Sequence, residues 1–533
     1  MLISLLVTVL FGLIYFYINI PAINIHAPEF YQFVILLCVV FCGVNIFESG
    51  FHASDIKDYF KFMIKKATVP FIIAAAMVVI SVVGSVVGSE VFRSRSYAKL
   101  LTVEQGDFSE EVNEVSWNQI PMLDDVSANT LANKKLGELS DLVSQFEVDS
   151  SSVQINYQGS PVRATYLNYG DVIKWWNNHD EGIPAYILID MATQEVTINR
   201  LEEGIKYAPS EYFNHDIDRY LRLKYPTKMF SSVNFEVDEE GNPYWIASVV
   251  TKTIGLFGGT DVEGAVLVNA VTGEHAYYDM GDIPTWVDRV CNAGLIIEQY
   301  DYYGTFQNGF LNSIFGQSGC TVSTSGYNYI AMDDDVWVYT GVTSVGGDES
   351  NLGFILVNQR TKEARYYACA GANENAGMLS AEGAVQQYAY ESTFPILLNI
   401  GGEPTYFMSL KDSSSLVKMY AMVNVSQYQI VAVGSTVEEC QQNYSDLLKK
   451  GGIVKEEEAI VDELKVSGVI DDIRSSVIDG NTYYYIHLSN NVPYYMICAK
   501  DSEVAAILNV GEEVSITYEA GEGEILKGIT LER

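Results

Sequence analysis

A group of acidic residues in the middle of the chain has the composition of a cation-binding site. Three aspartates occupy positions 333–335, and a Gly-Gly-Asp-Glu sequence follows at 346–349. Carboxylate oxygens are preferred ligands of Ca²⁺, so the two loops of Asp333–Glu349 could hold this ion if they meet in the fold. The alternative, which we favour, is a solvated turn before a strand, followed by a flexible glycine-rich loop.

The other residues of catalytic type are scattered along the chain. There is no nucleophile elbow, P-loop, HExxH motif or dinucleotide fingerprint, and Ser318 in GQSGC follows no clear strand. None of the six His lies near Cys or carboxylates at ligand spacing, and the seven Cys form no CxxC pair. We therefore expect no cofactor, no metal centre and no enzymatic activity. An envelope hydrolase or its regulator, with Asp333–Glu349 as its site, is the alternative.

Length and charge limit the possible partners. A chain of 533 residues is expected to form several domains. It carries 68 acidic and 32 basic residues, for a net charge of −36. Such an acidic surface repels phosphates, so nucleic acid is not an expected partner. The 36 tyrosines favour strands.

A strand-ending pattern occurs three times. In each copy an Asp or Asn is followed three positions later by Thr and two positions after that by Glu. The side chain of the first residue can bond the backbone two residues on, which makes it the corner of a tight hairpin. The copies are Asp190, Thr193 and Glu195; Asn269, Thr272 and Glu274; and Asn358, Thr361 and Glu363.

These corners belong to a larger repeat, in which a helix precedes a glycine turn and the hairpin. The expected helices are 127–144, 210–224, 284–290, 380–391 and 435–450, the last with a capping box at Ser435 and Glu438. The expected turns are at Gly159, Gly241, Gly326 and Gly402. The fourth unit keeps only Asn424 of the corner pattern, as degenerate terminal repeats do.

The second unit carries a family resemblance. A helix followed by EVDEEGNPYWIASV and GAVLVNAVTGE resembles the PepSY module, a helix packed on a small antiparallel sheet that ends in a VDAxTGE hairpin. The match is best at Asn269, Thr272 and Gly273, the last of which is replaced in the other two copies. The resemblance covers 127–450 and implies an inhibitory, chaperone-like or interaction domain. The whole chain is similar to uncharacterised membrane proteins of Gram-positive bacteria, sometimes filed under the colicin V production family.

The N-terminal region predicts a membrane anchor. The stretches 1–20, 30–47 and 69–89 are apolar, and about 20 such residues cross a bilayer as a helix. The first stretch has no basic n-region and no cleavage site, so we expect it to be retained. In the third, Gly84 and Gly88 form a GxxxG motif that predicts a contact with another helix.

The positive-inside rule suggests an orientation for this anchor. The first loop, 21–29, has no Lys or Arg, whereas the second, 48–68, has four lysines: Lys57, Lys61, Lys65 and Lys66. The second loop is therefore predicted in the cytoplasm and the part after 90 outside the membrane. Arg93, Arg95 and Lys99, just past the third stretch, oppose this orientation.

The C-terminal region predicts a small barrel. Five strand-like segments with one short helical segment after the third follow the linker 451–464, which is the element order of an OB fold. The full α+β prediction is an anchor (1–90), a linker (91–126), PepSY-like units (127–205, 206–282, 283–370 and 371–450), the second linker and an OB-like barrel (465–533). Such an architecture is expected to serve a non-enzymatic, membrane-anchored scaffold that binds a protein partner or forms a homo-oligomer.

Overall fold

A computed structural model describes residues 1–50, 57, 65, 67–114, 120–332, 334–346, 350–453, 463–478, 481–489, 491–500, 502–519, 523 and 525–533. The chain has a mixed α+β fold that divides into two compact units, Met1–Lys450 and Gly451–Arg533. Each unit is considered separately.

Three apolar helices begin the larger unit: α1 (Leu2–Asn19), α2 (Pro28–Glu48) and α4 (Thr68–Val87). Each is long and apolar enough to cross a membrane. They pack α1 against α2 and α2 against α4, with Tyr15 of α1 stacked on Phe33 of α2 at 5.5 Å. Many of their large side chains are exposed, as lipid-facing residues would be. The prediction of three N-terminal apolar helices is confirmed.

Four antiparallel sheets follow, each a meander of four consecutive strands. Sheet 1 contains β3 (Val153–Tyr157), β4 (Ser160–Tyr169), β5 (Ile183–Asp190) and β6 (Val196–Ile205). Sheet 2 contains β7 (Met229–Val237), β8 (Pro243–Ile254), β9 (Gly258–Asn269) and β10 (His275–Asp279). Sheet 3 contains β12 (Asn328–Met332), β13 (Asp335–Ser344), β14 (Ser350–Asn358) and β15 (Ala364–Ala372). Sheet 4 contains β17 (Ile396–Ile400), β18 (Glu403–Lys411), β19 (Val417–Asn424) and β20 (Val431–Gly434).

Short strands extend three of these sheets. β2 (Phe146–Val148) pairs with β4, β11 (Thr321–Ser323) with β13, and β16 (Glu391–Ser392) with β18. β1 (Val103–Gly106), which precedes all four sheets in the chain, pairs in parallel with β15 of sheet 3.

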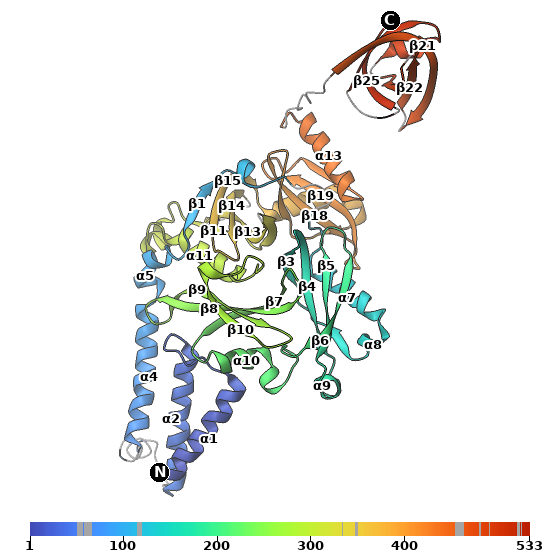
Figure 1. Cartoon of the computed structure of the whole chain (residues 1–533). Helices are drawn as coiled ribbons and strands as arrows, with labels where there is room; N and C mark the ends of the chain where they lie inside the picture. Colours follow the sequence, from blue (N-terminus) through green and yellow to red (C-terminus); the bar gives the residue numbers. More distant parts are fainter. Residues whose placement is uncertain are drawn as a thin grey trace. The chain divides into compact units, whose positions relative to one another are not determined.

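The four sheets form a ring (Figure 1). Tyr166 of sheet 1 packs on Trp245 of sheet 2 at 4.8 Å, and one hydrophobic cluster joins sheets 2 and 3. Phe354 of sheet 3 packs on Tyr406 of sheet 4 at 5.9 Å, and Gln194 next to β5 donates to the Tyr420 hydroxyl of sheet 4 at 3.4 Å. Neighbouring sheets meet where β3 contacts β7 and β13 and where β12 contacts β17. Four-stranded sheets around a central axis are the arrangement of a β-propeller.

Helices lie between and outside the sheets. They are α5 (Glu90–Tyr97), α6 (Phe108–Glu111), α7 (Asp125–Gly137), α8 (Ser140–Val143), α9 (Val172–Asn178), α10 (Ile217–Lys224), α11 (Ala293–Phe306), α12 (Glu374–Ala384) and α13 (Val437–Lys450). Short helical turns are η2 (Phe213–His215), η3 (Met280–Asp282), η4 (Asn312–Gly316) and η5 (Gln386–Tyr388).

Two predicted helix positions and one predicted helix cap are wrong, because the capping residues lie elsewhere. The helix expected at 284–290 begins at 293, where Asn292 accepts the N–H groups of Gly294 and Leu295. The helix expected at 380–391 begins at 374, capped by Asn373. The cap of α13 is Thr436 rather than Ser435, since its Oγ1 accepts the Glu439 N–H at 3.1 Å.

One predicted turn is also wrong. Gly159, Gly241 and Gly402 lie at the turns between the first two strands of sheets 1, 2 and 4, all with positive φ. Gly326 instead precedes β12. The corresponding turn of sheet 3 contains Asp334, with a φ of 67°, a conformation that Asp tolerates better than most residues.

The described parts of the segment 91–126, which is predicted as a linker, pack against the ring. Beyond the β1–β15 pairing, Asn399 of sheet 4 donates to the Val112 carbonyl at 2.6 Å. Met122 N–H donates to the Met191 carbonyl beside sheet 1 at 3.0 Å. The segment therefore connects three of the sheets.

Gly84 and Gly88 face a hairpin rather than another helix, so the predicted role of this motif is wrong within the chain. A Cβ atom added at Gly84 would lie 2.8 Å from the Leu256 side chain, and one at Gly88 would lie 3.1 Å from the Ile254 carbonyl. These residues belong to the β8–β9 hairpin, whose Phe257 also packs edge-on against Tyr31 of α2. The small side chains thus let sheet 2 approach the anchor.

The smaller unit contains five strands: β21 (Glu463–Ile478), β22 (Asn481–Leu488), β23 (Tyr494–Cys498), β24 (Glu513–Glu519) and β25 (Ile525–Glu532). They pair in the closed order β21-β22-β23-β25-β24, with β21 reaching both β22 and β24. The short helix η6 (Glu503–Ile507) follows β23. Ile486, Tyr495 and Ile516 are at the centre of its core.

Candidate functional site

A cavity of about 410 Å³ lies among sheets 1, 3 and 4. Its walls come from strands and turns of these sheets, and the segment around Glu114 covers part of it. Protein ligand sites are typically clefts of this order of size, with a few polar groups that fix the ligand. The cavity is therefore the candidate binding site of the larger unit.

The charge of the cavity is negative. Glu114, Asp190 and Asp334 line it, and the described residues that line it include no Lys, Arg or His. Asp334 accepts a hydrogen bond from Asn156 Nδ2 at 2.6 Å. Three carboxylates without a cation among the described lining residues would attract a ligand that carries an amine or guanidinium group.

Asn399 adds a buried polar group to this wall. It is 2% exposed and lines the cavity, and its Nδ2 is held by the Val112 carbonyl. Its Oδ1 has no hydrogen-bond partner among the described residues. Buried polar atoms are rarely left unpaired, which makes this oxygen a candidate acceptor for a ligand's N–H group.

Asp190 reaches the cavity because it is a hairpin corner. Its Oδ1 accepts the N–H groups of Ala192 and Thr193 at 2.9 and 2.7 Å, and the Thr193 hydroxyl accepts the Glu195 N–H. The corners at Asn269–Thr272 and Asn358–Thr361 have the same set of hydrogen bonds. An Asn therefore supports this turn as well as an Asp does, and of the three corners the cavity takes in only that of sheet 1.

The loops of the possible Ca²⁺ site are described only in part. Asp334 bonds Asn156, and Asp335 is paired with Arg360 at 2.6 Å. Asp333 and 347–349 lie outside the described residues. Among the residues described, no group of three His, Cys, Asp or Glu is placed to hold a metal ion.

Two buried carboxyl groups beside the cavity escaped the sequence analysis. Glu236 of β7 is fully buried and accepts the N–H groups of Asp288 and Arg289 at 2.8 and 2.9 Å. Asp288 Oδ2 accepts the N–H of Asn156, a cavity residue, at 2.6 Å. Burial raises the pKa of Glu236 to about 7. Burial and the charge of Glu236 raise the pKa of Asp288 well above its usual value.

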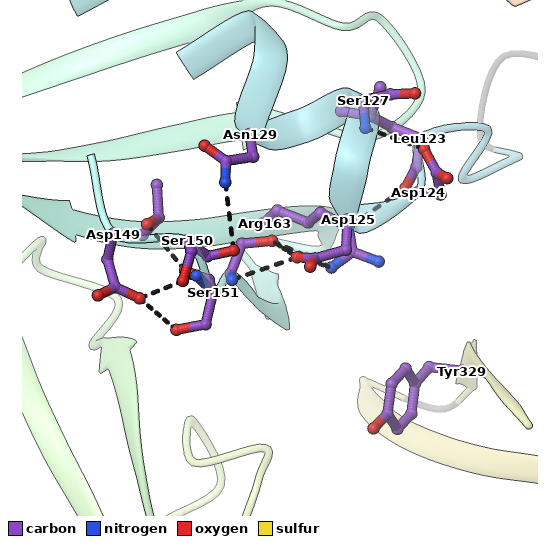
Figure 2. A network of polar contacts seen from close by, with 12 residues as sticks. Leu123, Asp124, Asp125, Ser127, Asn129, Asp149, Ser150, Ser151, Arg163 and Tyr329 are labelled. Atoms are coloured by element: carbon purple, nitrogen blue, oxygen red, sulfur yellow. Dashed lines mark hydrogen bonds and ion pairs between the residues drawn. The ribbon is translucent and has the colours of Figure 1, made fainter. Parts of the chain in front are cut away.

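Arg163, which the sequence analysis also missed, links the segment 123–125 to sheet 1 (Figure 2). This side chain, 8% exposed, donates to the Leu123 carbonyl at 3.2 Å and to Asp125 at 3.3 Å. Lys411 of sheet 4 binds the neighbouring Asp124 at 2.6 Å. The charged residue within the otherwise apolar strand PVRATYLNY could have indicated this contact, because an Arg is rarely buried without a partner.

Comparisons with known proteins were made for sequence and structure. No protein-family model matches the chain, and no curated protein is similar to it in sequence. A solved Bombyx mori GH32 beta-fructofuranosidase in complex with sucrose is 10% identical, with 75% of this chain and 69% of that chain covered and a TM-score of 0.18. Bacillus subtilis levansucrase is 9% identical, with 81% and 96% covered and a TM-score of 0.16. Likenesses this weak carry no argument about activity.

Proposed function

We propose that the chain is a non-enzymatic, membrane-anchored binding protein, whose ring holds a cationic segment of a protein partner outside the cytoplasmic membrane. The observation that carries the proposal is the cavity, which is lined by three carboxylates and by Asn399, whose Oδ1 has no hydrogen-bond partner among the described residues. The strand order of the smaller unit supports the OB-like assignment, which would provide a second binding surface. The PepSY-like character of the four units remains a prediction.

The orientation of the anchor supports an extracytoplasmic ring. Ile23 N–H and Asn24 Nδ2, both in the first loop, donate to the carbonyls of Pro226 and Thr227 at 2.8 Å. The loop without Lys or Arg and the ring thus lie on the same side of the three helices. By the positive-inside rule this is the side away from the cytoplasm.

Neutralising the cavity is expected to weaken its binding of a cationic peptide. The variant combines Glu114→Gln, Asp190→Asn and Asp334→Asn; the Asn at 190 keeps the corner, as Asn269 does in sheet 2. Affinity for a labelled tetralysine peptide should fall about tenfold, because each of three ion pairs contributes roughly 0.5 kcal/mol. The measurement is fluorescence anisotropy on the full chain in nanodiscs of zwitterionic lipid.

A matched control separates the cavity from the overall charge. Asp180→Asn, Glu202→Gln and Glu203→Gln remove three exposed carboxylates from the same unit, outside the cavity. This control should retain nearly all of the affinity. An equal loss in both variants would mean that the peptide follows only the net charge, and the proposed site would be wrong.

A further inference from the structure

A compact apolar patch lies on the surface of the ring near the anchor. It comprises residues of α9 and of the loop before α10: Val172, Ile173, Trp176, Tyr212 and Phe213, with exposed fractions of 53, 68, 68, 44 and 64%. Large exposed side chains gathered in this way mark interaction surfaces more often than isolated ones do.

Trp175 packs beneath the patch and fixes the positions of its aromatic side chains. Its ring packs on Tyr212 at 4.6 Å, on Phe213 at 6.1 Å and on Trp176 at 6.0 Å. The indole Nε1 donates to the buried Glu211 at 2.8 Å, and the same carboxylate accepts the Tyr169 hydroxyl at 2.7 Å. The exposed side chains therefore project from a fixed base.

Contacts with the C-terminal end of α1 determine the depth of the patch relative to the bilayer. Asn214, the neighbour of Phe213, accepts a hydrogen bond from the Tyr17 hydroxyl of α1 at 3.2 Å. Arg219 donates to the Tyr17 carbonyl at 3.1 Å, and Arg222 to the Ile20 carbonyl at 2.9 Å. Since α1 ends at Asn19, these contacts place the loop of Phe213 where the helix leaves the hydrocarbon. Figure 1 shows α9 and α10 at the end of the ring from which the three helices extend.

We infer that this patch lies in the interface of the same bilayer that the helices span. Trp and Tyr prefer the headgroup region, where an apolar ring and a polar edge are both accommodated, and apolar neighbours such as Ile173 and Phe213 would reach the upper acyl chains. The continuity from α1 through Tyr17 and Asn214 to Phe213 selects lipid as the occupant. The ring is then held at the membrane both by the three helices and by this patch.

Quenching by spin-labelled lipid tests this inference on the full chain. Cysteine replaces Ile173, Phe213 or, as a control, the exposed Leu416 of the turn between β18 and β19. The background is Cys498→Ser, because the other six cysteines are buried. Each protein is labelled with an environment-sensitive fluorophore and reconstituted into phosphatidylcholine nanodiscs with or without lipid that carries a shallow nitroxide on its acyl chain.

The expected result is loss of emission at 173 and 213 in the nitroxide nanodiscs and unchanged emission at 416. If labels at 173 and 213 respond no more than the label at 416, the patch does not contact the bilayer, and the inference fails in favour of a protein partner or a second copy. Intact helices are verified in each sample by circular dichroism, so that a misfolded variant is not scored.

Discussion

Replacing Arg360 by Met is expected to lower the free energy of unfolding of the larger unit by about 3–5 kcal/mol, the usual cost of leaving one partner of a buried ion pair alone. Arg360 Nε and Nη2 donate to the two oxygens of Asp335 at 2.6 and 2.7 Å. Asp335 is 6% exposed and lies at the start of β13. Without the guanidinium, the side-chain hydrogen bond that remains to this carboxylate among the described residues is the one from the Asn358 amide at 2.8 Å.

Two further variants give this prediction its controls. Arg360→Met combined with Asp335→Asn removes both charges and should recover most of the lost stability, because Asn can still accept the Asn358 bond. Arg200→Met breaks the exposed pair with Asp141, which is 57% exposed, and should cost less than about 1 kcal/mol. Chemical denaturation in nanodiscs, followed by tryptophan fluorescence, measures all three. A similar loss for Arg360→Met and Arg200→Met would contradict the buried role of the Asp335 pair.

The second large effect is on the pH dependence of stability. Glu236 has a pKa raised by burial to about 7, against a usual value of 4.5. A carboxyl with a raised pKa binds its proton more tightly in the folded state, so its contribution is fully present below about pH 4.5 and is lost as pH rises through about 7. The pKa of Asp288 is also raised, so this residue adds to the loss of stability with rising pH.

Glu236→Gln removes the titration while it keeps the side chain's size. Stability of variant and wild type is compared from pH 4 to 8, and the expected result is that the difference moves in favour of the variant as pH rises. Groups away from Glu236 cancel in this difference, whereas Asp288, whose pKa the charge of Glu236 raises, changes with it and moves the difference in the same direction. The exposed change Glu202→Gln provides the control. A difference that is constant with pH, or that moves in favour of the wild type, would show that Glu236 is already ionised in the folded state throughout this range.

The features that sequence predicted well are those defined by local patterns. The three apolar helices follow from uninterrupted runs such as 69–89. The hairpin corner at Asn269 is predicted by the spacing of this residue to Thr272 and Glu274, because the side-chain hydrogen bonds that form the corner join residues within 269–274. The five strands of the smaller unit follow from alternating apolar residues between turns.

The ring and its cavity depend on contacts between distant segments, which no local pattern specifies. The segment around Gly326 has the residue types of a hairpin turn, but the turn between the first two strands of sheet 3 contains Asp334 instead. This is possible because the left-handed backbone conformation is open to Asp as well as to Gly. Nothing near Val112 in sequence indicates its bond to Asn399, 287 positions away. Asp190 was selected as a structural corner, and only the assembled ring shows that it also faces a cavity.

Thiol labelling in intact cells tests whether three spans hold the ring outside the membrane. In the Cys498→Ser background, cysteine is introduced at the exposed Ser413 of the β18–β19 turn or at Ser54 in the Lys-bearing second loop. A membrane-impermeant maleimide should label 413 in intact cells and 54 only after the cells are permeabilised. Labelling of 54 with protection of 413 would place the ring in the cytoplasm, which is the opposite of the proposed orientation.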